Sequence, residues 1–587
     1  MTVKPFGLLS PKPLDNATEL KISVSASDVL NLPLVSGSSY NFEVDYGEGG
    51  GFKPVTAYND ANASNTYTSG GVYNVVIKGD LETFATSVAG NLELYLQSIV
   101  SLGEHAMSSL NFTGCGLITS VTGQIKDVNV NIGSLFSGCT LLPSVPSDFF
   151  ELHESGVYTS VFESTGLTAI DPLWFSYNAN ITNFARTFFG CASISGIIPG
   201  STFTNNSLVT TFDSTFMGCV GITETGVGLF DSCTQVSTFI RAFQNCTSLA
   251  TLASGLFDSC GLCTVFQYTF ANSGITAIPA GLFDNCPAVV TFLGTFQLCS
   301  DLAGIPTDLF KFNVANITFF QTFYACTSIT IVPVDLFRYC VLVNTFQNTF
   351  LGCSGLLSFT AGLFDYNTQV TSFYSTYEGC NSIATAIPSN YFDNNTLVTT
   401  FRNTFRGCTS TTGAIPTNLF INNNLVNTFQ QTFYQCGITS IPSGLFSTNT
   451  QVLSFRQTFF DCQSNTGLPA NLFDNNTLVT TFYQCFYRNV LVPSVPLDFF
   501  KFNAAVTDYT GVFQSCRNLA APATIFNPAN LAIVTSFSYF MLADAVAHSA
   551  TGTMQDIWTP SIIASSIQAF RNDTALTNYA AIPAGWK

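Results

Sequence analysis

Residues 401–428 read FRNTFRGCTSTTGAIPTNLFINNNLVNT, and this stretch decides the fold. It opens with two phenylalanines four residues apart, Phe401 and Phe405, and a cysteine follows at Cys408. An Ile-Pro pair and a Leu-Phe pair come next, separated by threonine and asparagine. The same order of residue types returns every 26 to 28 residues along most of the chain. A fixed period of this length is typical of a solenoid, in which each repeat packs against its neighbours.

The Phe-Phe-Cys signature defines a ladder of side chains that should point into the core of every repeat. We count about 17 repeats, and the C-terminal ones match the repeat pattern less well. The clearest copies supply the predicted structural ladder, which consists of Phe184, Phe188, Cys191, Phe212, Phe216, Cys219, Phe239, Phe243, Cys246, Phe319, Phe323, Cys326, Phe401, Phe405 and Cys408.

Each apolar group of the repeat predicts one side of a coil. The spacing of the two phenylalanines places both rings on one face of a helical turn. The short run that ends in Ile-Pro predicts a parallel strand stopped by proline, and the Leu-Phe pair predicts a second inward corner. The expected coil therefore contains one short parallel strand and one short helical turn.

The beginning of the chain has a different pattern. Short alternating runs such as residues 21–26, 40–44 and 72–77 are separated by clusters of glycine, asparagine and serine, which is typical of a small all-β domain. The predicted organisation is an N-terminal arm over residues 1–19, a β domain over residues 20–95 and a solenoid over residues 96–587.

Residues 42–49, FEVDYGEG, together with residues 71–77, GVYNVVI, resemble the polycystic-kidney-disease (PKD) type of immunoglobulin-like β-sandwich. The resemblance covers about 60 residues. It departs from the family pattern at Tyr46, Glu48 and Asn65. Domains of this family imply a spacer or adhesion module.

The repeat itself resembles the BspA-type leucine-rich repeats and the related DUF285 repeats. Residues 322–333, TFYACTSITIVP, match their pattern of aromatic, Phe, Cys and Ile-Pro positions, and the resemblance covers about 480 residues. It implies a leucine-rich-repeat-like solenoid that is displayed on a surface for binding, often in bacterial adhesins.

The 19 cysteines follow the period of the repeat. Their positions exchange with asparagine and serine in other repeats, which favours small buried thiols over metal ligands or a disulfide framework. Cys260 and Cys263 form a CxxC pair, but no second pair supports a zinc site.

Six copies of the Leu-Phe or Tyr-Phe corner end in aspartate. Carboxylates on neighbouring repeats could bind Ca2+, whereas the simpler alternative is that each aspartate closes its own turn. We expect no cofactor, with Ca2+ as the alternative. The six aspartates are Asp231, Asp258, Asp284, Asp365, Asp393 and Asp474.

Composition excludes several classes of function. The net charge is −17 and only 9% of residues are charged, so a nucleic-acid partner, which needs clustered lysine and arginine, is not expected. No window reaches the roughly 20 apolar residues of a membrane helix. The three histidines, His105, His153 and His548, lie far apart, and no motif of a catalytic or phosphate-binding site occurs. We therefore expect a protein that is not an enzyme.

The N-terminal stretch has no apolar run of secretory length, and Pro5, Pro11 and Pro13 interrupt it. Together with the adhesin-like repeat, this favours a structural and binding protein of a virus particle, such as a phage fibre, decoration or receptor-binding component on the virion surface. Its expected partners are other virion or surface proteins and host glycans or proteins, within a homo-oligomer or larger assembly. The alternative is a bacterial cell-surface or secreted BspA-like adhesin exported by a non-classical route.

Overall fold

A computed structural model describes residues 16–517, 519–559 and 565–587. The chain divides into two compact units, Met1–Ile275 and Thr276–Lys587, and each is described by itself. Most of the predicted N-terminal arm, residues 1–15, lies outside the described residues.

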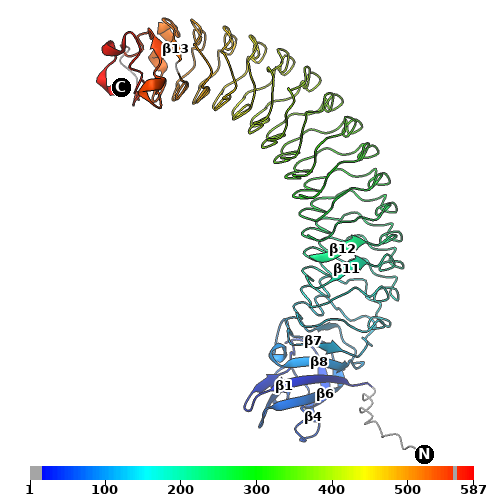
Figure 1. Ribbon diagram of the computed structural model, residues 1–587. Coiled ribbons are helices and arrows are strands. Elements are labelled where there is room, and N and C mark those ends of the chain that lie inside the picture. The colour runs from blue at the N-terminus through cyan, green and yellow to red at the C-terminus, as the bar shows by residue number, and fades with distance from the viewer. Residues whose placement is uncertain (1–15, 518, 560–564) are drawn as a thin grey trace, which may run out of the picture. The chain divides into compact units, whose positions relative to one another are not determined.

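The first unit begins with a six-stranded sheet in the order β10-β8-β1-β6-β3-β4 (Figure 1). Strand β1 alternates between buried and more exposed positions, with Leu20 and Ile22 fully buried, because one face of the sheet covers the core. A separate antiparallel pair joins β2 (Val29–Asn31) to β5 (Ser64–Thr66). The strands of the large sheet are β1 (Thr18–Val24), β3 (Tyr40–Asp45), β4 (Lys53–Val55), β6 (Gly71–Leu81), β8 (Leu96–Ser101) and β10 (Ser120–Val121).

Strand β8 is where the pairing changes from antiparallel to parallel. It pairs antiparallel with β1 and parallel with β10. Nearby, β7 (Thr83–Ala85) pairs in parallel with β9 (Ser109–Asn111). The predicted boundary between residues 95 and 96 falls immediately before β8, so two strands of the sheet, β8 and β10, lie beyond that boundary. Parallel pairing between successive repeats begins here.

The repeats are coils that pair in parallel, mostly through isolated bridges. One column of bridges precedes the phenylalanine pair, for example Thr211 with Thr238 in the first unit and Thr400 with Thr428 in the second. Among the described repeats, pairing near the Ile-Pro segment reaches four residues only between β11 (Ser195–Ile198) and β12 (Gly221–Thr225). Parallel pairing of this kind, repeated within each unit, makes each unit a solenoid. The remaining short elements are the 3-10 turns Ala61–Ala63, Leu92–Leu94, Pro528–Ile533, Val546–His548, Tyr579–Ala581 and Ala584–Trp586 and the strand pair β13 (Ala520–Ala521) and β14 (Thr551–Gly552).

The predicted helical turn at the phenylalanine pair is wrong, since the described residues contain no α-helix. The segment that starts at Phe184 is a series of turns. Arg186 has a φ of 57° and Gly190 has a φ of 70°, and a right-handed helix cannot contain such residues. The left-handed residue recurs at the same position in later repeats, such as Asn403 and Gln431.

The hydrogen bonds explain why turns replace the helix. The amides of this segment alternate along the chain: one donates to a carbonyl within the turn, and the following one donates to a carbonyl of the next repeat. The amide of Thr187 donates to Phe184 at 3.1 Å, whereas the amide of Phe188 donates to Thr215 of the next repeat at 2.9 Å. A helix would use every amide internally, and the carbonyls of the stacked repeat would then lose their donors. Stacking therefore overrides the helical spacing of the sequence.

The phenylalanine rings fill the core as continuous stacks. All 15 predicted ladder residues have 0% of their surface exposed. In the first unit, Phe212 and Phe239 lie 5.6 Å apart with planes inclined by 5°, and Phe216 and Phe243 lie 5.3 Å apart. The second of these columns extends back to Phe112. Rings offset in this way gain stacking energy beyond the burial of their area.

Polar side chains bind the repeats together inside the core. The hydroxyl of Thr215 donates to the Phe184 carbonyl of the preceding repeat at 2.9 Å, and the thiol of Cys219 donates to the Phe188 carbonyl at 3.0 Å. In the second unit, the amide of Asn395 donates to Phe364 at 3.1 Å. Each of these donors satisfies a carbonyl that is buried between repeats.

Candidate binding surface

All 19 cysteines are buried. Burial raises the pKa of the Cys246 thiol to about 12 and the pKa of the Cys191 thiol to about 11. Thiols with such pKa values stay protonated at neutral pH and react slowly. Their chemistry is therefore that of small buried donors. Cys260 and Cys263 are buried like the others.

The aspartates of the Leu-Phe corner fold back over their own turns. A Cβ atom on Gly228 would lie 3.2 Å from a carboxylate oxygen of Asp231, and one on Gly255 would lie 2.7 Å from Asp258. Both glycines have positive φ, 81° and 70°. In the second unit the same arrangement recurs at Asp284, with a distance of 3.1 Å, and at Asp365, with 3.3 Å.

Two neighbouring aspartates of this column affect each other. Burial and then the nearby Asp365 raise the pKa of Asp393, and one carboxylate oxygen of Asp393 is buried without a hydrogen-bond partner. Burial also raises the pKa of Asp474. Over the described ranges, no three carboxylate, histidine or cysteine side chains lie close enough together to hold a metal ion.

The three histidines lie at separate places. His105 is buried in the first unit, where its ring contacts the Thr18 hydroxyl at 2.8 Å and the Gly79 carbonyl at 2.7 Å. His153 contacts the Tyr158 hydroxyl and a backbone carbonyl, both at 2.9 Å. Burial lowers the pKa of both rings. His548 pairs with Asp544 at 2.8 Å.

Exposed hydroxyl groups form a column in parts of each unit, two residues before the first phenylalanine of the repeat. In the second unit this hydroxyl column is interrupted at Val290, Ile317, Asn344, Asn427 and Leu453. In the first unit, the Thr210 hydroxyl donates to the Thr182 carbonyl at 3.1 Å, and the Ser237 hydroxyl donates to the Thr210 carbonyl at 3.1 Å. In the second unit, Thr399 donates to Thr371 at 3.2 Å. Each hydroxyl proton is used by the preceding repeat, so the oxygens face outward in fixed positions.

A second feature lies on the outward side of the phenylalanine-pair segments in residues 429–488. The side-chain amides of Gln431, Gln457 and Gln484 form a hydrogen-bonded row, with distances of 2.8 and 2.9 Å. Beside this row the rings of Tyr434 and Phe460 lie 4.4 Å apart and nearly parallel, and Tyr487 continues the stack at 4.4 Å. We call these three rings the outer aromatic stack. This group of residues was not foreseen, although the Gln and aromatic residues at a constant spacing were visible in the sequence.

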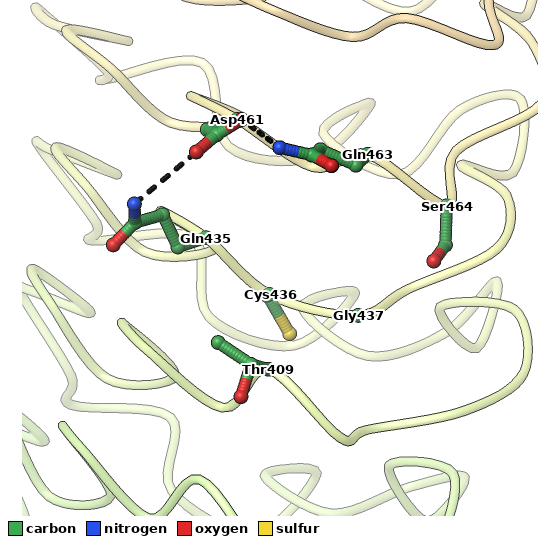
Figure 2. A pocket seen from close by; sticks show the side chains of 7 residues that line it. All are labelled: Thr409, Gln435, Cys436, Gly437, Asp461, Gln463 and Ser464. Carbon is green, nitrogen blue, oxygen red and sulfur yellow. Dashed lines mark hydrogen bonds between the residues drawn. The ribbon is translucent and has the colours of Figure 1, made fainter.

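A cavity of about 380 Å3 opens at Gly437, between Thr409 and Asp461 (Figure 2). It lies beside a short coil, in which four residues separate Cys436 from Ile441, whereas six separate Cys408 from Ile415 in the preceding repeat. We call this cavity the Gly437 notch. Its lining residues come from three successive repeats and are Thr409, Gln435, Cys436, Gly437, Asp461, Gln463 and Ser464.

Asp461 organises the wall of the Gly437 notch. Its side chain is only 7% exposed. It accepts hydrogen bonds from the Gln435 amide at 3.2 Å and the Gln463 amide at 2.8 Å, as Figure 2 shows. The Arg488 guanidinium lies 3.8 Å from the same carboxylate. The short coil itself is held tightly, because a Cβ atom on Gly437 would lie 2.3 Å from the Thr411 carbonyl oxygen.

The described part of the chain contains no helix long and apolar enough to cross a membrane. No protein-family model matches the chain, and no curated protein matches it.

Among the solved structures, 23 chains match. One is Toll from Drosophila, solved as the Toll–Spatzle complex, with 14% identity and a TM-score of 0.21 over 76% of this chain and 48% of that one. Another is TLR13 in complex with ssRNA13, with 12% identity and a TM-score of 0.13 over 80% of this chain and 81% of that one. This chain thus spans about half the length of the first. The solenoid architecture of this chain is shown by its parallel bridges and stacked rings.

Proposed function

We propose that this chain is a non-enzymatic structural and binding protein of a virus particle, in which the solenoid is displayed for attachment to a host surface. The observation that carries the proposal is the exposed hydroxyl column, because it presents the same chemical group on runs of successive repeats, as at Thr210 and Ser237 and again at Thr480, Thr507 and Thr535. A surface of this kind suits a ligand that is itself repetitive. Many weak contacts then add up to firm attachment.

The hydroxyl column is already ordered before any ligand binds. The Thr480 hydroxyl donates to the Leu453 carbonyl at 3.1 Å, and the Thr535 hydroxyl donates to the Thr507 carbonyl at 2.9 Å. Side chains held in this way lose little conformational entropy when a ligand binds. The low content of charged residues, 9%, favours neutral polar ligands such as glycans over nucleic acids.

The finer assignments belong to the same proposal. The repeat is proposed to be of the BspA and DUF285 type, and the N-terminal sheet domain to be a PKD-like module that attaches the chain to other proteins of the particle. The proposed location is the virion surface, within a homo-oligomer or larger assembly. No cofactor is part of the proposal.

Mass spectrometry of purified virions and of washed cell envelopes from the same source culture tests the proposal. We expect peptides of this chain to be enriched in the particles together with capsid or tail proteins. Enrichment in envelopes of uninfected cells would contradict the virion assignment and favour the alternative, a bacterial surface adhesin.

A further inference from the structure

Four of the seven residues that line the Gly437 notch have side chains that form hydrogen bonds without carrying charge. The hydroxyls of Thr409 and Ser464 and the amides of Gln435 and Gln463 each supply both donors and acceptors. A ligand complementary to this wall must itself carry several groups that both donate and accept. Neighbouring hydroxyls on a compact ring meet this requirement.

The carboxylate of Asp461 narrows the class of ligand. It already accepts from Gln435 at 3.2 Å and Gln463 at 2.8 Å and faces Arg488 at 3.8 Å. An anionic ligand would meet the like charge of this carboxylate, and the Arg488 guanidinium beside it is already paired with Asp461. Hydroxyl groups, in contrast, can donate to a carboxylate, and such charge-assisted bonds are the stronger kind. Neutral polyols therefore fit better than acids or phosphates.

The wall is held in place before binding. Gln435 and Gln463 each commit an amide nitrogen to Asp461, so their amide oxygens stay in fixed positions. The short coil between them has little freedom, since a Cβ atom on Gly437 would meet the carbonyl oxygens of Thr411 at 2.3 Å and Thr409 at 2.4 Å. A prearranged polar wall binds a ligand with a smaller entropy loss than a mobile one.

The outer aromatic stack is next to the lining of the notch in sequence, because Tyr434 immediately precedes Gln435 and Phe460 immediately precedes Asp461. The two rings lie face to face at 4.4 Å, so the two segments that carry Gln435 and Asp461 are packed against each other.

From this geometry we propose that the Gly437 notch is a binding site for a neutral pyranose sugar within an oligosaccharide. Asp461 accepts hydrogen bonds from its hydroxyls, the amides of Gln435 and Gln463 exchange hydrogen bonds with them, and Thr409 and Ser464 close the two sides. The volume of about 380 Å3 lies in the range of small-molecule sites. The inference rests on the proposed glycan-binding function and adds to the exposed hydroxyl column one defined site.

Saturation-transfer-difference NMR on the full chain tests the proposal, with maltose, cellobiose, lactose and chitobiose at millimolar concentration and sialyllactose as the acidic comparison. Three variants are compared with the unaltered chain. Thr409→Trp fills the notch from an exposed position. Asp461→Asn keeps the shape of the side chain and removes its charge. Asn381→Trp is the matched control, because Asn381 is exposed and follows Cys380 as Thr409 follows Cys408, one repeat away from the notch.

We expect at least one neutral disaccharide to give a signal with the unaltered chain and with Asn381→Trp. Thr409→Trp should abolish that signal, and Asp461→Asn should weaken affinity about tenfold, as the loss of a charge-assisted hydrogen bond implies. Thermal unfolding of each variant shows whether the fold is retained. If Thr409→Trp folds and binds as well as Asn381→Trp, the notch is not the site, although glycan binding elsewhere on the chain stands. If no neutral sugar binds, or only sialyllactose does, the inference is overturned, while the virion assignment is decided separately by the particle proteome.

Discussion

At the positions that face the preceding repeat, threonine, cysteine and asparagine act through the same bond, a donation to a buried backbone carbonyl. The thiol of Cys340 lies 3.6 Å from the carbonyls of Phe310 and Asn313. In the next repeat the amide of Asn367 donates to the corresponding carbonyls, at 3.1 Å to Phe337 and 2.9 Å to Cys340. This shared geometry explains why cysteine and asparagine exchange freely along the chain.

The role of this donor predicts an asymmetry between two substitutions of Asn395. Asn395→Ala removes the side-chain donor to the carbonyls of Phe364 and Asn367, which keep only their backbone donors, and should destabilise the surrounding repeats by about 1–3 kcal/mol. Asn395→Cys should cost clearly less, because cysteine makes this contact elsewhere in the same column. Hydrogen exchange of residues 364–423 measures the difference, and equal protection in the two variants would contradict the role assigned to the donor.

The buried thiols should resist alkylation. Burial raises the pKa of the Cys353 thiol to about 12, so both the thiolate and access to it are lacking in the folded chain. Treatment with iodoacetamide at pH 8 should leave Cys353 and Cys246 unmodified in the native protein. Both should be modified in urea, which serves as the control. Mass spectrometry of the digested protein gives the extent of modification at each site.

At the scale of one element, the turn segment depends on residues that adopt a left-handed backbone conformation. The coil that follows it depends on residues small enough for a neighbouring backbone to approach closely. The position two residues after the first phenylalanine has positive φ in many repeats, as at Arg241 with 56° and Gln321 with 56°. Such a residue costs on the order of 1 kcal/mol when it is not glycine. The hydrogen bonds to both neighbouring repeats offset that cost. The element is therefore stable only within a stack.

The short coil of the Gly437 notch should not accept a larger residue. Gly437→Ala places a methyl group 2.3 Å from a backbone carbonyl oxygen and should destabilise the fold by about 1–3 kcal/mol through overpacking. Gly467→Ala is the matched control from the following repeat, since a Cβ atom there would have no neighbour within 4 Å. Thermal unfolding compares the two variants. Similar melting temperatures would show that the coil shifts to make room.

The last turns of the chain should respond to pH through Asp573. This side chain is fully buried, it accepts from the Ala550 amide at 3.0 Å, and burial raises the pKa of Asp573 from 3.8 to about 7. Because the folded state holds this proton more tightly than the unfolded state, the associated stability is present below about pH 4 and is lost as pH rises to about 7.

Hydrogen exchange of residues 565–587 between pH 4 and pH 8 checks this sign. Protection corrected for the intrinsic exchange rate should fall across that range in the unaltered chain. Asp573→Asn, which carries no charge at any of these pH values, should show a flatter profile. The same decrease in both proteins would mean that another group controls the C-terminal turns.

At the scale of the whole molecule, no repeat is complete by itself. Its rings are covered by the rings of its neighbours, as in the stack of Phe401 on Phe429 at 6.0 Å, and half of the amides in its turn segment donate to the next repeat. Stability in such a chain is approximately the sum of contacts between neighbouring repeats. Binding surfaces are then built by repetition, as in the hydroxyl column, or by a break in repetition, as in the Gly437 notch.

A peptide of residues 401–428 alone should therefore be unfolded. The burial of its few large side chains does not offset the entropy of ordering its backbone. Circular dichroism should show a disordered spectrum for this peptide, whereas the full chain shows an ordered one. An ordered single repeat would contradict the view that stacking supplies the stability.

The sequence by itself determined the period, the solenoid and the identity of the inward columns, because each depends only on which residue types recur at which spacing. Phe184, Phe188 and Cys191 could be placed in the core without knowledge of any neighbour. Tertiary structure decided the backbone of the turn segment. The spacing of the two phenylalanines suits a helix, but the carbonyls of the stacked repeat compete for the same amides, and that competition is not visible within one repeat. The Gly437 notch was decided in the same way, since its lining residues come from three repeats and meet only when those repeats are stacked.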